Sequence, residues 1–228
     1  MSTKIYVNPA THAEIHPCAG KEGCNETAHC LEYCRILCAY LRACGFEVKM
    51  GEYSYQSTQG MLDAIKESNA WGANLHMAVH TNGCASHEGT GSRPMYYSVG
   101  YGKPIVDKIL EWRAKIYPRK MKSGQNQQLA ELRDTKATAV YEELVFHDNK
   151  EDAVWFHENM QRMAEYTARA LCEYYGVVFV DPFAPPPEPA KLPLYRVQVG
   201  AFRHKGNAES MLKKLKEAGF DGYIKEGD

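Results

Sequence analysis

The chain has 228 residues, a net charge of −1, 44% hydrophobic residues and 24% charged residues, as expected for a soluble protein with one α/β domain and a small second unit. The near-zero charge gives no basic field that would attract nucleic acid or an anionic membrane. No apolar run approaches the roughly 20 residues of a membrane-spanning helix, so we expect neither nucleic-acid binding nor membrane insertion.

Apolar strands alternate with helical segments through the first half of the chain. Residues 26–43 carry apolar residues three and four positions apart, as in an amphipathic helix, and Gly45 ends the pattern. Residues 74–80 are apolar almost throughout, which is typical of a strand covered on both faces. The expected elements are a strand over 4–8, a helix over 26–43, a strand over 46–50, a helix over 59–69 and a strand over 74–80.

The second half continues this alternation and ends in a long helix. The expected elements are a strand over 94–99, a helix over 103–117, strands over 130–133 and 139–145, and a helix over 150–175. Strands that alternate with helices favour parallel pairing with helices packed on both faces. The sequence therefore predicts an α/β catalytic domain over residues 1–180, built on a mainly parallel central sheet with helices on both faces.

A proline-rich segment separates this domain from a smaller C-terminal unit. Residues 181–193 are so rich in proline that an extended, semi-rigid linker is expected. Residues 194–228 then read as a small βαβ unit. Its expected elements are a strand over 195–200, a helix over 207–218 and a strand over 222–225.

Eight cysteines are present, and their placement favours reduced thiols. Cys30, Cys34 and Cys38 recur every four residues along one helix face, where neighbouring side chains diverge from disulfide geometry. We expect these thiols to pack as small apolar groups. A second metal site that uses Cys18, Cys24 and His29 is the less favoured alternative, because no Cys-x-x-Cys pair supports it.

Four polar side chains stand where predicted strands or helices meet loops. His12 follows the first strand, Glu26 opens the first helix, His80 ends the strand over 74–80, and Glu143 interrupts an apolar strand. Ligands gather at the carboxyl ends of parallel strands, where three of the four would lie. Two imidazoles and one carboxylate form a three-ligand Zn²⁺ shell with an open position. We therefore expect His12, Glu26 and His80 to bind zinc and Glu143 to act as the catalytic base.

The same residues also have structural interpretations that need no metal. A carboxylate at the start of a helix is favoured by capping and by the helix dipole, which would explain Glu26 without a metal. His80 alone would serve equally well as a buried structural histidine. Glu142 competes with Glu143, and strand alternation places the two on opposite faces, so only one of them can face the metal.

The sequence does not decide which residue of the first loop binds the metal. His12, Glu14 and His16 all lie between the first strand and the first helix. His12 is preferred because it is nearest the end of the strand. Four further histidines are expected at the surface or around the site, with His147 lining the cleft: His29, His87, His147 and His157. His76, four residues before His80 on the same strand face, is expected to be structural.

These motifs resemble those of the zinc-dependent N-acetylmuramoyl-L-alanine amidases, the peptidoglycan-cleaving enzymes of bacterial cell-wall hydrolases and phage endolysins. In that family one strand ends in Asp-Pro-Gly-His, a Glu opens the first long helix, another strand ends in Ser-Ile-His-Ala-Asn, and the last reads Val-Glu-Xaa-Gly-Phe. This chain is similar over residues 8–12, 25–26, 78–82 and 142–149. Its first histidine falls one residue later, and Val145 replaces the family's glycine. The spacing to Phe146 favours Glu143 over Glu142.

The resemblance implies hydrolysis of the amide bond between N-acetylmuramic acid and L-alanine in peptidoglycan. Zn²⁺ would activate the water, and Glu143 would take up its proton and pass it to the leaving amine. Asn82, in the second histidine motif, is a candidate substrate-binding residue. The alternatives are a zinc carboxypeptidase or peptidase of similar fold and a non-catalytic peptidoglycan-binding protein.

The C-terminal unit resembles the first half of a SPOR (sporulation-related repeat) domain over residues 195–220. The resemblance implies binding to glycan strands that have lost their stem peptides, with Gln198 and Phe202 as candidate contacts. The SPOR family continues with a second strand–helix–strand, which does not follow here.

The start of the chain resembles no signal peptide, because residues 1–7 run directly into the first predicted strand. We therefore expect synthesis in the cytoplasm without a signal peptide and action at the bacterial cell wall, as for a phage endolysin.

Overall fold

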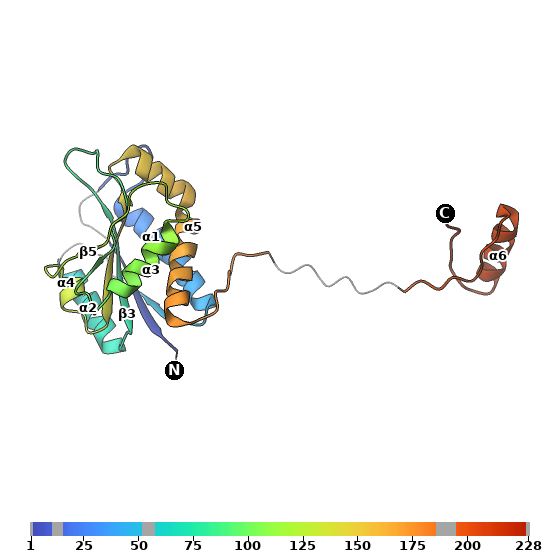
Figure 1. Cartoon of the computed structure of the whole chain (residues 1–228), viewed down its shortest axis with the longest axis horizontal. Coiled ribbons are helices and arrows are strands. Elements are labelled where there is room, and N and C mark those ends of the chain that lie inside the picture. The colour runs from blue at the N-terminus through green and yellow to red at the C-terminus, as the bar shows by residue number, and fades with distance from the viewer. Residues whose placement is uncertain (1, 11–15, 52–57, 186–194, 227–228) are drawn as a thin grey trace. The chain divides into compact units, whose positions relative to one another are not determined.

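A computed structural model describes residues 2–10, 16–51, 58–185 and 195–226 of the chain. The chain divides into two compact units, residues 1–184 and residues 185–228. The first unit holds all the strands among the described residues, and the second holds a single helix (Figure 1).

Six strands of the first unit form one sheet in the order β2-β1-β3-β6-β4-β5. Neighbouring strands pair in parallel, except that β4 runs antiparallel to β6. This confirms the predicted mainly parallel sheet. The strands are β1 (Lys4–Pro9), β2 (Glu47–Met50), β3 (Leu75–Asn82), β4 (Met95–Tyr96), β5 (Gly124–Gln125) and β6 (Thr138–Phe146).

Helices cover both faces of the sheet, as the alternating side chains of β1 show. Ile5 and Val7 join the large core formed with α1, α3 and α5, whereas Tyr6 points to the other face and packs with Ala64 of α2. The helices of this unit are α1 (Glu26–Ala43), α2 (Thr58–Trp71), α3 (Lys103–Arg113), α4 (Ala130–Arg133) and α5 (Lys150–Tyr175).

The two long helices begin and end where local residues favour it. Asn25 caps α1, its side chain accepting a hydrogen bond from the backbone N–H of Ala28. Asn149 caps α5 in the same way, and Gly176 follows α5 in the left-handed conformation with φ of 68°. Both helices have the limits that the sequence predicts.

The prediction of a strand over residues 130–133 is wrong, because these residues form the short helix α4. Ala, Glu, Leu and Arg all favour a helix, and the backbone N–H groups of Leu132 and Arg133 both bond to the carbonyl of Leu129. The predicted strand over 94–99 is reduced to β4, because Ser98 and Tyr101 exchange backbone hydrogen bonds and turn the chain.

The expected βαβ pattern is not found in the described part of the second unit, which contains α6 (Lys205–Glu217) and no strand over residues 195–226. A strand needs a neighbour for its backbone groups, and two short strands with one helix make a marginal sheet. No residue of α6 is buried. Large apolar side chains are therefore left exposed: Tyr195, Val197, Val199, Phe220 and Tyr223.

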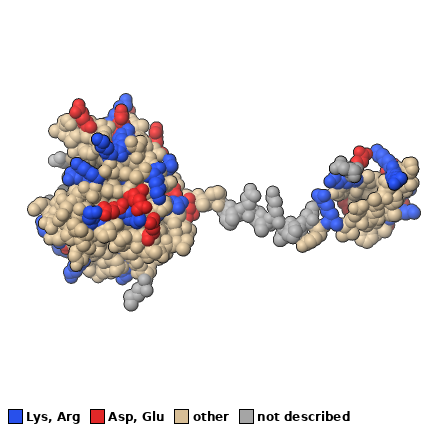
Figure 2. Space-filling view, in the orientation of Figure 1, with Lys and Arg blue, Asp and Glu red and all other residues tan. Residues whose placement is uncertain are grey.

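Positive and negative side chains are mixed on the face of the first unit that Figure 2 displays. None of the helices in the described residues is both long and apolar enough to cross a bilayer. Even α5, with 26 residues, carries charged side chains along its length.

Candidate active site and metal centre

The carboxyl ends of β3 and β6 bring two of the predicted residues side by side. His80 and Glu143 are register partners in this parallel pair. Their side chains share one face with Tyr141, whose ring stacks on His80 with centroids 4.4 Å apart. His80 and Glu143 therefore lie at the same edge and on the same face of the sheet.

Glu142 points to the opposite face, as strand alternation predicts. Its carboxylate accepts a 2.8 Å hydrogen bond from Arg113 of α3, and both side chains are fully buried. Arg113 also donates to the hydroxyl of Thr167 at 2.9 Å. Of the two adjacent glutamates, Glu142 is therefore the one that faces the helices, where it forms a buried ion pair with Arg113.

Glu26 does not cap α1, since Asn25 fills that role. Its side chain is 5% exposed, accepts a 2.9 Å hydrogen bond from the backbone N–H of Thr81, and lies 3.5 Å from His80 Nδ1. Because a buried carboxylate is costly without partners, this placement favours the site interpretation of Glu26 over the capping one.

Glu131 is a site residue that the sequence analysis missed. It lies in α4, with Oε2 3.7 Å from His80 Nε2 and Oε1 3.2 Å from His76 Nε2, and it also accepts a hydrogen bond from the side chain of Asn8. A carboxylate in a segment predicted to be a strand, between Leu129 and Leu132, was the available signal.

These contacts set the charge of His80. Burial by itself lowers the pKa of His80, but the carboxylates of Glu131 and Glu26 outweigh it and raise that pKa to about 9. Burial likewise opposes ionisation of Glu131, yet its contacts with His76 and His80 lower the pKa of Glu131 to about 2. The two carboxylates thus favour the protonated form of the His80 imidazole.

Candidates for a third metal ligand lie in the first loop and directly after β6. His16, Glu26 and His147 offer donor atoms that all lie within 4.8 Å of one another. The rings of His16 and His147 have centroids 5.9 Å apart. The preferred ligand His12 lies outside the described residues, as does Glu14, so the choice between His12 and His16 stays a prediction.

A second group of donors lies beside this one. Cys18, Cys24, His29 and His157, which we call the Cys–His cluster, bring one donor atom each to within 4.8 Å of one another. Burial lowers the pKa of His29 to about 3 and raises the pKa of Cys18 above its ordinary value. His157 joins from α5, far away in the sequence, and no local signal predicts this. All eight cysteines are free, and those along α1 are buried as expected.

The remaining candidates for substrate binding lie at a strand end and in the second unit. Asn82 ends β3, and its side-chain oxygen accepts a hydrogen bond from the backbone N–H of Gly83. In the second unit, Gln198 donates to the carbonyl of Gly200 at 3.4 Å, and Phe202 is 42% exposed.

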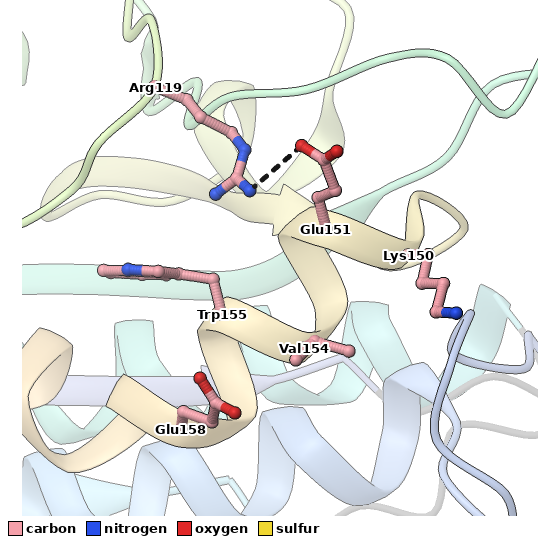
Figure 3. A pocket seen from close by; sticks show the side chains of 6 residues that line it. All are labelled: Arg119, Lys150, Glu151, Val154, Trp155 and Glu158. Carbon is pink, nitrogen blue, oxygen red and sulfur yellow. Dashed lines mark hydrogen bonds and ion pairs between the residues drawn. The ribbon is translucent and has the colours of Figure 1, made fainter.

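A surface pocket of about 500 Å³ lies over the first turns of α5 (Figure 3). Arg119 and Glu151 form an ion pair at its rim, and Trp155 and Glu158 line it further along the helix. None of the predicted site residues lines this pocket.

A family profile described as N-acetylmuramoyl-L-alanine amidase matches residues 8–173, which include β1, α1, β3 and β6. The chain belongs to this family. A SPOR domain profile matches residues 191–228. Both resemblances read from the sequence are thereby confirmed.

Two curated relatives are each 26% identical to this chain. The N-acetylmuramoyl-L-alanine amidase CwlM of Bacillus licheniformis aligns over 172 residues, 73% of this chain and 62% of that protein, so the chain spans less than two thirds of its length. The sporulation-specific N-acetylmuramoyl-L-alanine amidase of Bacillus subtilis strain 168 aligns over 97% of this chain and 84% of that protein.

Solved amidase domains share the fold. The catalytic domain of CwlV, an N-acetylmuramoyl-L-alanine amidase from Bacillus (Paenibacillus) polymyxa var. colistinus, superposes with a TM-score of 0.68 at 18% identity, covering 77% of this chain and 99% of that one. The catalytic domain of the CD27L endolysin, which targets Clostridia difficile, superposes with a TM-score of 0.62 at 22% identity, covering 75% and 97%.

Proposed function

We propose that this protein is a zinc-dependent hydrolase that cleaves the amide bond between N-acetylmuramic acid and L-alanine in peptidoglycan. Family membership over residues 8–173 supports the reaction. The observation that carries the proposal is the pairing of His80 with Glu143 across β3 and β6, with the Glu26 carboxylate 3.5 Å from His80. These are the groups that a metal-assisted hydrolase needs at one point.

The donor set fits Zn²⁺. Glu26 and His80 supply a carboxylate oxygen and an imidazole nitrogen, and a histidine of the first loop supplies the third ligand. His12 is the sequence preference, and the grouping of His16 with Glu26 supports His16 as the alternative. Three such ligands leave one position open. When bound there, zinc lowers the pKa of water and polarises the scissile carbonyl.

Glu143 is the proposed general base. Its carboxylate takes up a proton from the attacking water and delivers it to the amine nitrogen of the leaving L-alanine. Glu131 is a positioning residue, because its carboxylate faces Nε2 of His80 while Nδ1 faces Glu26. A metal-bound histidine ordinarily has such a partner on its second nitrogen.

Substrate recognition involves both units in this proposal. Asn82, two residues after His80 in β3, contacts the stem peptide, while the SPOR segment binds the glycan strand through Gln198 and Phe202. The layout is a catalytic domain over 1–180, a linker over 181–193 and a wall-binding unit over 194–228. The protein would then act at the bacterial cell wall, as an endolysin does.

The test is Glu143→Gln, which removes the base but keeps nearly the same shape. We expect release of new N-terminal alanine from purified peptidoglycan to fall by about 10²–10⁴-fold, with the zinc content and the circular dichroism spectrum unchanged. Treatment of the wild type with a chelator should abolish the activity, and added zinc should restore it. Glu151→Gln, at an exposed position on α5, serves as the control.

Three outcomes would contradict the proposal. Release of C-terminal residues in place of N-terminal alanine would indicate a zinc carboxypeptidase or peptidase. Equal wall lysis by the wild type and by Glu143→Gln would show that this carboxylate is not the base. Binding to cell walls without any bond cleavage would indicate a non-catalytic binding protein.

A further inference from the structure

The Cys–His cluster has the composition and spacing of a tetrahedral metal site. Cys18 Sγ and Cys24 Sγ lie 3.0 and 3.6 Å from His29 Nδ1, and Cys24 Sγ lies 3.0 Å from His157 Nε2. For zinc–sulfur bonds of about 2.3 Å and zinc–nitrogen bonds of about 2.0 Å, neighbouring tetrahedral donors lie about 3.5 Å apart. The sulfur–nitrogen distances are therefore close to those of an S₂N₂ shell.

Cys18 and Cys24 lie at the two ends of a short loop that backbone hydrogen bonds close. The backbone N–H of Cys18 donates to the carbonyl of Cys24 at 3.1 Å, and Lys21 bonds to both ends of the turn. Gly20 and Gly23 have φ of 77° and 74°, the left-handed conformation in which glycine is favoured. The turn thus presents two sulfur atoms to one point.

The histidines come from two helices that pack against each other. His29 lies in the first turn of α1 and His157 in the second turn of α5. A metal ion here would fasten the first loop to both helices. The loop residues 16–25 contain few buried apolar side chains that could hold them otherwise: Cys18 alone is buried there.

The second nitrogen of His29 has the partner that a ligating imidazole requires. His29 Nε2 lies 2.8 Å from Thr81 Oγ1, and both groups are buried. With Nδ1 on a metal, Nε2 carries the proton and donates it to this hydroxyl, which fixes the tautomer and the ring orientation. The ring of Phe156 packs edge-on against His29 with centroids 5.4 Å apart.

We propose that the Cys–His cluster binds a structural Zn²⁺ ion, separate from the metal at Glu26 and His80. Two thiolates and two imidazoles in a closed tetrahedral shell are a typical structural zinc set. Binding releases the two thiol protons to solvent. Thr81 connects the Cys–His cluster with the proposed catalytic centre. Its hydroxyl contacts His29, and its backbone N–H donates a hydrogen bond to Glu26.

Two local adjustments accompany binding. The two sulfur atoms lie 2.6 Å apart in the structure and must separate to about 3.8 Å around one zinc ion. Lys21 Nζ lies 3.1 Å from His157 Nδ1. Once Nε2 binds metal, Nδ1 carries the proton and can no longer accept a hydrogen bond from the lysine. The exposed Lys21 side chain therefore moves away and is solvated by water.

Metal content tests the proposal on the full chain, purified under reducing conditions without a chelator. Glu26→Ala with His80→Ala should keep about one zinc per chain, whereas Cys18→Ser with Cys24→Ser should lose about half of the wild-type zinc. Cys34→Ala with Cys38→Ala, two buried thiols on α1, is the matched control and should keep all of it. Equal zinc in the Cys18/Cys24 variant and the wild type would overturn the proposal.

Two measurements do not require a Cys18/Cys24 variant to fold. X-ray absorption at the zinc edge of the Glu26/His80 variant should show sulfur scatterers at about 2.3 Å, and a shell of nitrogen and oxygen alone would contradict the proposal. Intact mass spectrometry of the non-reduced wild type should show no Cys18–Cys24 disulfide, since a disulfide would leave no thiolates for the metal. None of these readouts is amidase activity, so the structural site and the proposed reaction can fail separately.

Discussion

At the scale of single residues, two adjacent glutamates in β6 have opposite surroundings. Glu142 is fully buried and paired with Arg113, whereas Glu143 lies on the face of His80 and Tyr141. A buried ion pair gives little net stability over an apolar pair, but removing one partner leaves a charge without compensation. The pair therefore matters most when it is broken on one side.

Replacing Arg113 tests this ion pair. We expect Arg113→Met to reduce the free energy of unfolding by about 3–5 kcal/mol, because Glu142 would remain buried without its cation. The double variant Arg113→Met with Glu142→Leu should recover much of that loss. The measurement is the urea midpoint at constant m value. Equal loss in the single and double variants would contradict this account.

Glu131 is a second single residue that can be tested, because its carboxylate orients His80. Glu131→Gln keeps the shape but removes the charge facing His80 Nε2. We expect zinc affinity at the proposed catalytic centre to fall by about 10–100-fold, measured by competition with a coloured chelator in a variant that also lacks Cys18 and Cys24. Glu151→Gln is the control, and an unchanged affinity in Glu131→Gln would remove its positioning role.

At the scale of elements, local residues account for most of the limits of the long helices. The side chain of Asn149 accepts hydrogen bonds from the backbone N–H groups of Glu151 at 3.1 Å and Asp152 at 3.2 Å, and Gly176 ends α5. Such signals depend on neighbours in the sequence, so helix limits could be predicted there. The limits of β4 could not, because the sheet and the turn after it set its length.

The cap of α5 gives a test at this scale. Asn149→Ala should destabilise the first unit by about 1 kcal/mol, because two backbone N–H groups lose their acceptor. Asn149→Asp keeps an acceptor and should retain most of the stability. Thermal or urea unfolding of the two variants compares them directly, and equal loss in both would indicate that the side-chain amide matters more than the cap.

At the scale of the whole molecule, the two units differ in how they are stabilised. The first has a continuous core on one face of the sheet and a smaller cluster on the other. The second has a 13-residue helix with no buried residue, and isolated helices of that length are marginal in water. Helix α6 therefore depends on local interactions, such as the ion pair between Lys213 and Glu217.

Hydrogen exchange of the full chain tests this difference. We expect the backbone amides of α6 to exchange close to the rate of an unfolded peptide, while those of β3 exchange only with global unfolding of the first unit. Protection of α6 equal to that of β3 would show that the second unit is packed against a surface that stabilises it.

The sequence by itself determined the order of the main elements, the α/β class, the two family resemblances and the choice of His80 and Glu143 as candidates, because periodicity and motif spacing are local properties. Only the tertiary structure decided which side chains converge. Glu26 contacts His80 instead of capping α1, Glu131 reaches His80 from α4, and His157 reaches Cys24 from α5. All three contacts depend on how distant elements pack. Packing between elements is a property of the whole fold, and no short stretch of sequence contains it.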